Sequence, residues 1–156
     1  MESLAEIQER TFARATASTK GSYPPEDRLA EDELRTFLRR RAFAVVTSTR
    51  PDGRPHAAIS SFACAGTTFW LPTGAGTVRE RNIAGQPWVS LVITDGDRGE
   101  HVCVIAEGPA EIVSAAEVPP QARADAAGQW AERWIRLRTE RLLSYASDQT
   151  RARLAD

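Results

Sequence analysis

Six short segments rich in β-branched and aromatic residues, separated by turn sequences, constrain the fold of this chain more than any other feature. The segments are residues 43–49, 54–63, 67–71, 87–94, 100–107 and 110–113. Arg50-Pro51-Asp52-Gly53 separates the first two, and Gly108-Pro109 separates the last two. Proline and glycine disfavour a continuing strand and favour reversal of the chain. Strands at this spacing predict an antiparallel barrel or sandwich.

Helical patterns flank the predicted strands. Leu34, Phe37 and Leu38 lie at the i, i+3, i+4 spacing of one helix face and predict a helix over residues 31–41. A second short helix is expected over residues 77–84, in the longest gap between strands.

The ends of the chain follow weaker patterns. Leu4, Ile7 and Phe12 predict a short N-terminal helix, and the Gly, Ser and Pro residues of 16–25 predict a loop after it. Alanine-rich residues 117–131 favour a helix. Residues 134–138 alternate like a strand, although Trp130, Trp134, Leu137, Arg141 and Tyr145 also fit a helical stripe; we predict the strand. The resulting division is an N-terminal helix and loop (1–30), a barrel domain (31–148) and a tail (149–156).

Composition narrows the functional class. A length of 156 residues suits one domain, and a net charge of −1 gives no general footprint for nucleic acid. No apolar run reaches 18 residues and the N-terminus lacks a signal-peptide pattern, so we expect a cytoplasmic protein without membrane contact. His56, His101, Cys64 and Cys103 match no metal-ligand spacing, so we expect no metal.

One glycine-rich segment, Thr73 to Asn82, follows a predicted strand and opens a predicted helix. Backbone amides at a helix start bind anions, and glycine lets the backbone approach a ligand closely. No lysine follows Lys20, so a side-chain charge for a phosphate must come from arginine. Arg79 can donate to a phosphate in bidentate fashion, and Thr77 adds a hydroxyl. The segment therefore predicts phosphate binding, the alternative being a loop whose glycines only relieve strain.

The order of these motifs resembles a known family. Val46-Thr47-Ser48-Thr49, the turn to His56, Phe69-Trp70-Leu71, Thr77-x-Arg79-x-Arg81-Asn82, Pro87-x-Val89-Ser90-Leu91 and Glu107-Gly108-Pro109 follow one another along the chain. This order is similar to that of the pyridoxamine 5′-phosphate oxidase-like split β-barrel proteins, in particular their flavin- and deazaflavin-dependent oxidoreductase branch. The resemblance covers residues 34–113 well and the C-terminal part loosely.

The resemblance implies a mainly β fold with peripheral helices, a six-stranded antiparallel split β-barrel. It implies a homodimer with a cofactor in each of two interfacial grooves. It places the family's phosphate-binding lysine at Arg79. The implied cofactor-binding residues are Ser60, Ser61, Thr73, Gly74, Thr77, Arg79, Asn82, Glu100 and His101.

The implied activity is hydride transfer between the deazaflavin coenzyme F420 and a small conjugated substrate, with FMN as the alternative cofactor. The cofactor performs such chemistry, so no catalytic residue of the protein is assigned. Three alternatives stay open: an FMN-dependent pyridoxamine 5′-phosphate oxidase-like enzyme, a haem-binding barrel, and a carrier or sensor that holds a flavin without turnover.

Overall fold

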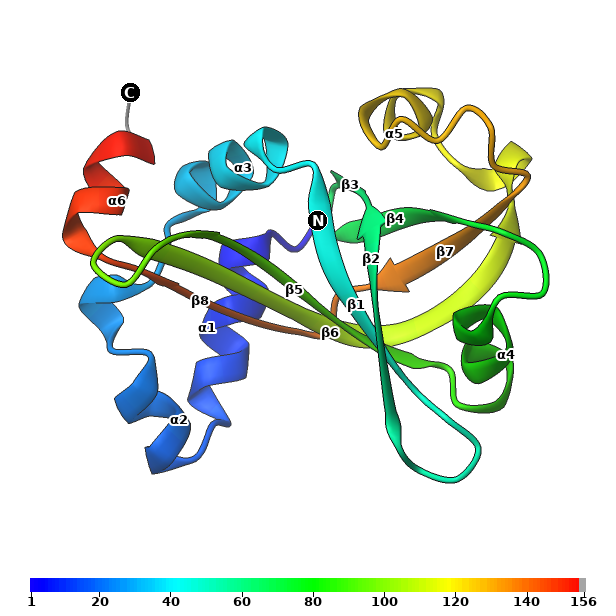
Figure 1. Cartoon of the computed structure of the whole chain (residues 1–156). Coiled ribbons are helices and arrows are strands. Elements are labelled where there is room, and N and C mark those ends of the chain that lie inside the picture. Colours follow the sequence, from blue (N-terminus) through cyan, green and yellow to red (C-terminus); the bar gives the residue numbers. More distant parts are fainter. Residues whose placement is uncertain (155–156) are drawn as a thin grey trace.

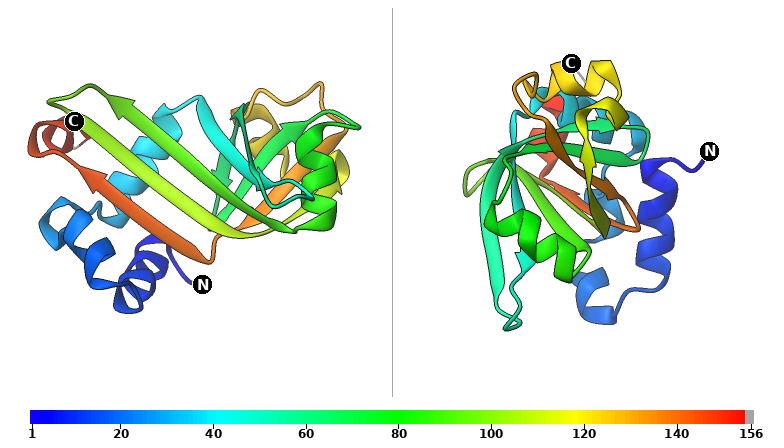
Figure 2. Two further views of the ribbon diagram at one scale, coloured as in Figure 1. Left: turned by 60° about the horizontal axis from the view of Figure 1, so that its bottom comes forward. Right: turned by 90° about the vertical axis from the view of Figure 1, so that its right-hand side faces the viewer.

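Eight antiparallel strands form the centre of the molecule in our computed structural model, which describes residues 1–154 (Figure 1). They are β1 (Phe43–Thr49), β2 (Pro55–Ser61), β3 (Ala63–Ala65), β4 (Thr68–Thr73), β5 (Trp88–Gly96), β6 (His101–Ser114), β7 (Arg133–Arg138) and β8 (Arg141–Ala146). The strands join in the order β2-β1-β5-β6-β7-β4-β3, and β8 pairs with the first half of β6. Figure 2 shows β5, β6 and β8 side by side.

The sheet curls because its two ends are consecutive in the chain. β2 and β3 stand at opposite ends of the strand order, yet Phe62 alone separates them in sequence. The hydroxyl of Ser60 on β2 accordingly reaches the Pro72 carbonyl oxygen on β4, at 3.5 Å. This curled antiparallel sheet is the predicted split barrel, with eight strands where the family resemblance implies six.

Strand β6 changes partner at Gly108. Its first half pairs with β8 as far as Glu107–Arg141, and its second half pairs with β7 from Ala110–Leu137 onward. The β7–β8 turn closes on Gly108, where an added Cβ would lie 2.0 Å from the Arg138 carbonyl oxygen. The expected break at Gly108-Pro109 is therefore wrong. Glycine permits the close approach, and β6 runs through.

Six helices and two 3₁₀ turns surround the sheet in the described residues. They are α1 (Leu4–Ala13), α2 (Ala17–Ser22), η1 (Pro25–Asp27), α3 (Glu31–Arg40), α4 (Val78–Gly85), η2 (Ala115–Glu117), α5 (Pro120–Asp125) and α6 (Asp148–Leu154). α1, α2, α3 and α6 gather at one end of the sheet, and α4 and α5 lie toward the other (Figure 1).

The main core joins α1 and α3 to the sheet. Leu4 and Ile7 of α1 and Phe37 of α3 pack in one cluster with buried strand residues such as Leu91 and Val104. Gln8 of α1 donates to the Leu29 carbonyl at 2.9 Å and accepts from the Ser144 hydroxyl of β8. A smaller cluster around Trp70 and Trp134 lies beneath α5.

The predicted helices over 31–41 and 77–84 correspond to α3 and α4, and the strand predicted over 134–138 is β7. Two further expectations are wrong. Residues 16–25 contain α2, because the Thr16 hydroxyl caps its first turn by accepting from the Thr19 amide. The helix expected over 117–131 is only α5, since the chain leaves the helix at Ala127, which has a left-handed φ of +48°, and the Gly128 amide donates to the Arg123 carbonyl at 2.9 Å.

α6 occupies most of the segment expected as a tail, and Ala155 and Asp156 lie outside the described residues. No helix within residues 1–154 is long and apolar enough to cross a membrane.

Candidate functional site

The loop from Thr73 to Thr77 connects the end of β4 to the first turn of α4. Gly76 has a φ of +73°, a left-handed conformation that glycine adopts without strain. Thr77 is the N-cap of α4, and its hydroxyl accepts from the Glu80 amide at 3.3 Å. The loop thus presents the free N–H groups of a helix start, which is an anion-binding geometry.

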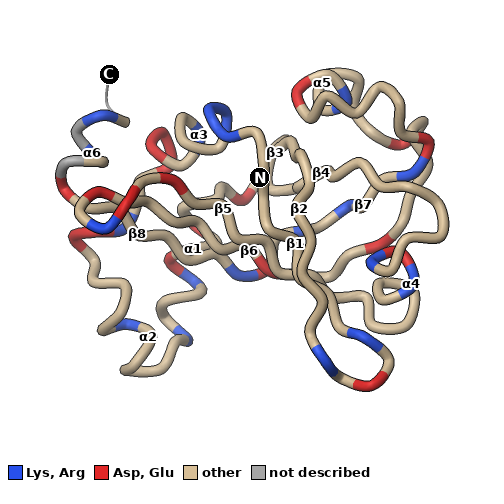
Figure 3. Tube along the Cα trace, viewed as in Figure 1, with Lys and Arg blue, Asp and Glu red and all other residues tan. Residues whose placement is uncertain are grey.

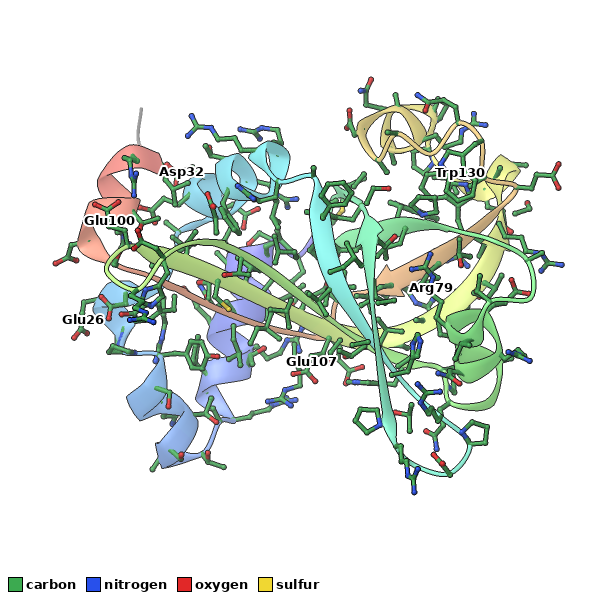
Figure 4. All side chains as sticks on the ribbon, viewed as in Figure 1. Glu26, Asp32, Arg79, Glu100, Glu107 and Trp130 are labelled. Carbon is green, nitrogen blue, oxygen red and sulfur yellow. The ribbon has the colours of Figure 1, made fainter. Side chains whose placement is uncertain are left out.

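Arg79, in the first turn of α4, folds back over this loop (Figure 4). Its Nε donates to the Thr73 hydroxyl at 3.0 Å, and a terminal nitrogen donates to the Pro72 carbonyl at 3.2 Å. The Thr73 and Thr77 hydroxyl oxygens lie 3.2 Å apart. An arginine has five N–H donors, so the two bonds the structure gives Arg79 leave three for a ligand. Burial lowers the pKa of Arg79 from its ordinary value.

Ser60 and Ser61 face opposite sides of β2, as neighbours on a strand must. Ser60 is buried. Its hydroxyl donates to the Ser61 carbonyl at 2.9 Å and lies 3.5 Å from the Pro72 carbonyl, which accepts from Arg79. Ser61 is half-buried and pairs with the exposed Phe43 of β1. The structure therefore brings Ser60, and not the Ser61 side chain, to the Thr73–Arg79 loop.

Asn82 is buried, and its side-chain nitrogen donates to the hydroxyl of Ser48 on β1 at 3.1 Å. Ser48 pairs across the strands with His56 of β2. His56 Nδ1 is buried and has no hydrogen-bond partner in the part of the chain that the structure describes. Neither Ser48 nor His56 is among the nine cofactor-binding residues that the family resemblance implies. Their proximity to Asn82 depends on strand register, which local pattern does not reveal.

Glu80 and Arg133 flank the same loop. Glu80 Oε1 lies 3.4 Å from a terminal nitrogen of Arg133, which pairs with Thr73 across β4 and β7. Glu80 is the one carboxylate between Thr73 and Asn82. Its single negative charge stands against the three positive charges of Arg79, Arg81 and Arg133. Arg133 compensates Glu80 only in part, because Glu80 Oε2 is buried without a hydrogen-bond partner among the described residues. The three arginines still leave the region with a net positive charge.

Glu100 lies at the other end of the molecule from Arg79 (Figure 4). It directly precedes His101, which begins β6 and pairs with Gly96 at the tip of the β5–β6 hairpin. The His101 ring stacks on Tyr145 with centroids 5.1 Å apart, and Glu100 forms an ion pair with Arg153 of α6. Within one chain these two residues do not join the Thr73–Asn82 loop.

The described residues contain no group of three His, Cys, Asp or Glu side chains placed to hold a metal ion. Both cysteines are unpaired thiols. Burial raises the pKa of the Cys64 thiol to about 11, against a smaller opposing effect of Arg35. Burial also raises the pKa of Cys103.

The protein is thus a split barrel with a positively charged loop at the start of α4. The sequence model of the pyridoxamine 5′-phosphate oxidase family matches residues 30–153. The chain belongs to that family. A search among curated proteins finds no match.

Several solved structures share this fold. The conserved hypothetical protein Rv2991 from Mycobacterium tuberculosis superposes with a TM-score of 0.66 at 22% identity, over 80% of this chain and 89% of that one. The haem storage protein HutZ from Vibrio cholerae gives 0.60 at 18%, over 74% and 94%. An FAD-binding protein from Mycobacterium smegmatis gives 0.56 at 19%, over 78% and 99%. At these identities the likeness concerns the fold.

Proposed function

We propose that this protein is an oxidoreductase that binds a flavin or deazaflavin, with coenzyme F420 the first candidate and FMN the second. It transfers a hydride between that cofactor and a small conjugated substrate. The observation that carries the proposal is the Thr73–Asn82 loop, where Arg79 lies over two hydroxyls at a helix start. Family membership and the fold shared with an FAD-binding protein support the choice of cofactor class.

The residues of the loop fit a phosphate group. Arg79 keeps three N–H donors, the first turn of α4 supplies backbone N–H groups, and Gly76 allows close approach. Thr73 and Thr77 lie where hydroxyls can bond to the phosphate or the chain that follows it. Ser60 lies beside them on β2, and we assign it to the part of the cofactor that follows the phosphate. The buried Nδ1 of His56 is a further polar atom in need of a partner.

We propose further that the active form is a homodimer. A row of apolar side chains crosses five strands on the outward face of the sheet. In register they are Ile59, Val45, Val92, Ile105 and Leu143. Ile59 is 64% exposed and the neighbouring Phe43 63%, and β1, β2 and most of β5 carry no charged side chain there (Figure 3). A contiguous apolar face of this kind marks an interface, and a second copy of the chain is its simplest self-complementary partner.

Dimerisation also accounts for the separation of the predicted site residues. Glu100 and His101 lie far from Arg79 in one chain, so they can line the same groove only if they come from the partner chain. When bound, the cofactor would supply the hydride chemistry. The chain's own residues would bind its phosphate, hold its ring and exclude water from it.

The test uses the purified protein after dialysis against high salt. Its absorbance is recorded, and it is then titrated with F420 and with FMN while cofactor fluorescence is followed. Menadione serves as a small conjugated acceptor for the reduced cofactor, under anaerobic conditions. We expect saturable binding of F420, weaker binding of FMN and an acceleration of cofactor reoxidation that depends on the protein.

Three results would contradict the proposal in different ways. Saturable binding with no acceleration for any conjugated acceptor would indicate a carrier or sensor. A Soret band in the purified protein, retained after dialysis, would indicate haem binding and a likeness in function to the haem storage protein of Vibrio cholerae. Tighter binding of FMN than of F420 would reverse the order of cofactors.

A further inference from the structure

A cavity of about 310 Å³ lies between α3 and α5, and we call it the α3–α5 cavity. Both helices contact β3, and Figure 1 shows them on either side of that strand. The cavity is lined from α3, Arg41 in the α3–β1 connection, the β2–β3 segment and the end of α5. None of the nine residues assigned to the cofactor lines it.

One wall of the cavity is basic and keeps hydrogen-bond donors free. Arg35 is committed, because its Nε donates to Glu31 at 2.8 Å and its NH1 to the Gly66 carbonyl. Arg41 pairs through NH1 with Asp95 at 2.9 Å, but its Nε is buried without a partner in the described residues. Arg39 has one long contact, 3.4 Å to the Thr36 hydroxyl. Arg41 Nε is closed to the cavity as well as to solvent, so the donors that remain for a ligand are terminal nitrogens of Arg39 and Arg41.

The remaining surface is apolar, with one acidic residue. Leu38, Phe62 and Ala63 are each at most 5% exposed and form the apolar lining, together with the thiol of Cys64. Asp125, at the end of α5, contributes a carboxylate that accepts from the Gln121 side chain at 2.7 Å. A volume of about 310 Å³ lies at the lower end of the range for small-molecule sites.

We propose that the α3–α5 cavity binds a small organic monoanion, a carboxylate carried on an apolar body. Arg39 and Arg41 donate to the carboxylate, and the apolar body lies against Leu38, Phe62 and Ala63. Two arginines can hold a carboxylate through charge-assisted hydrogen bonds. The negative charge of Asp125 disfavours a second negative charge on the ligand, so a phosphate dianion is a poorer occupant. This site goes beyond the proposed redox function and does not depend on it.

Isothermal titration calorimetry of the purified full-length protein tests the proposal with 3-phenylpropionate. Two comparison ligands are 3-phenylpropanamide, which keeps the shape and lacks the charge, and phenyl phosphate, which carries more charge. We expect 3-phenylpropionate to bind about tenfold more tightly than either. Arg39→Ala should weaken its binding about tenfold. Arg40→Ala is the matched control, because Arg40 follows Arg39 on α3 and does not line this cavity.

Four results would overturn the proposal: no binding of 3-phenylpropionate, equal binding of its amide, tighter binding of phenyl phosphate, or an equal loss in Arg40→Ala. Cys64 provides a second readout that does not require a variant. Alkylation by iodoacetamide at about pH 9, followed by mass spectrometry, reports on both thiols. Saturating 3-phenylpropionate should slow alkylation of Cys64 at least threefold and leave Cys103 unchanged. Equal rates with and without the ligand, or slowing of both thiols, would place the ligand elsewhere.

Discussion

The side-chain nitrogen of Asn82 lies 3.1 Å from the hydroxyl oxygen of Ser48, and this hydrogen bond attaches α4 to β1 in the interior of the protein. Both residues are buried, with 3% and 4% of their surface exposed. Arg79 stands one turn earlier on the same helix. Asn82 therefore holds the helix that carries Arg79 and acts as a positioning residue for the loop.

Replacing Asn82 leaves the Ser48 hydroxyl buried without its donor. We expect Asn82→Ala to lower the free energy of unfolding by about 1–3 kcal/mol, measured by urea denaturation. In the double-mutant cycle with Ser48→Ala, we expect a coupling energy of at least about 0.5 kcal/mol. Additive effects of the two substitutions would show that the bond contributes nothing to stability.

Gly108→Ala tests the closure of the β7–β8 turn on β6. The new Cβ would meet backbone atoms of Arg138 and Glu140 at 2.0 to 3.0 Å, and backbone cannot rotate aside as a side chain can. We expect a loss of about 2 kcal/mol or more. Gly21→Ala is the control, because Gly21 lies in α2 with nothing within 4 Å of an added Cβ. It should be neutral or stabilise by up to about 1 kcal/mol. Similar effects of both changes would argue against the close turn.

The β-rich part of this fold is largely predictable from sequence, because alternation along a strand is a local property. The continuation of β6 through Gly108 and the end of α5 are not, because each depends on a contact made in the folded chain, such as the close approach of Gly128 to the Trp134 ring. The cap at Thr16 is a local bond to the Thr19 amide, and it outweighs the Gly, Ser and Pro composition that indicates a loop. Strand β8 does not show the alternation of apolar and polar residues that would predict it. Leu142 and Leu143 face opposite sides of the sheet, yet both are buried.

The candidate site also has a part that sequence predicts and a part that it does not. The spacing of Thr73, Thr77 and Arg79 indicates an anion site by itself, since all three belong to one loop and the helix after it. Ser48 and His56 join that region only through strand register, so sequence alone does not bring them to Asn82. Glu100 and His101 lie at the far end of the same chain. Whether a second copy brings them to the loop depends on how two chains pack, which the sequence of one chain does not reveal.

Ile59→Asp tests the proposed dimer. Ile59 lies at the end of the outward apolar row, 64% exposed, and a carboxylate there would be buried without a partner in the interface. By size-exclusion chromatography with light scattering, we expect the wild type at twice the chain mass of 17.1 kDa and the variant at the chain mass. Trp130→Ser is the control, since Trp130 is equally exposed in the turn before β7. A wild-type monomer, or a dimer unaffected by Ile59→Asp, would remove this face from the interface.

The raised pKa of Cys64 predicts how the rate of its alkylation depends on pH. Because burial raises its pKa to about 11, the reactive thiolate is scarce near neutral pH, and alkylation should be roughly a hundredfold slower than for a free cysteine. In a Cys103→Ser background, the rate should rise about tenfold per pH unit between about pH 8 and 10. The folded chain keeps this proton to higher pH than the unfolded chain. Its contribution to stability therefore falls from about pH 9 toward 11. A rate that levels off below about pH 9.5 would contradict the raised pKa.

Cofactor affinity of Arg79→Ala is the most direct test of the central claim, that the loop opening α4 binds the phosphate of a flavin or deazaflavin. Arg81→Ala is the matched control. Arg81 lies two residues after Arg79 in α4, is exposed, and stands on another side of the helix. Arg79→Lys keeps the charge and loses the planar pair of donors. Circular dichroism confirms that each variant is folded before it is titrated.

Fluorescence titration with FMN and with F420 then measures affinity for each variant. We expect Arg79→Ala to weaken both cofactors by about ten- to a hundredfold, since the phosphate is common to them. Arg79→Lys should lie between Arg79→Ala and the wild type, and Arg81→Ala should match the wild type. Equal affinities of the wild type and Arg79→Ala for both cofactors would contradict the account.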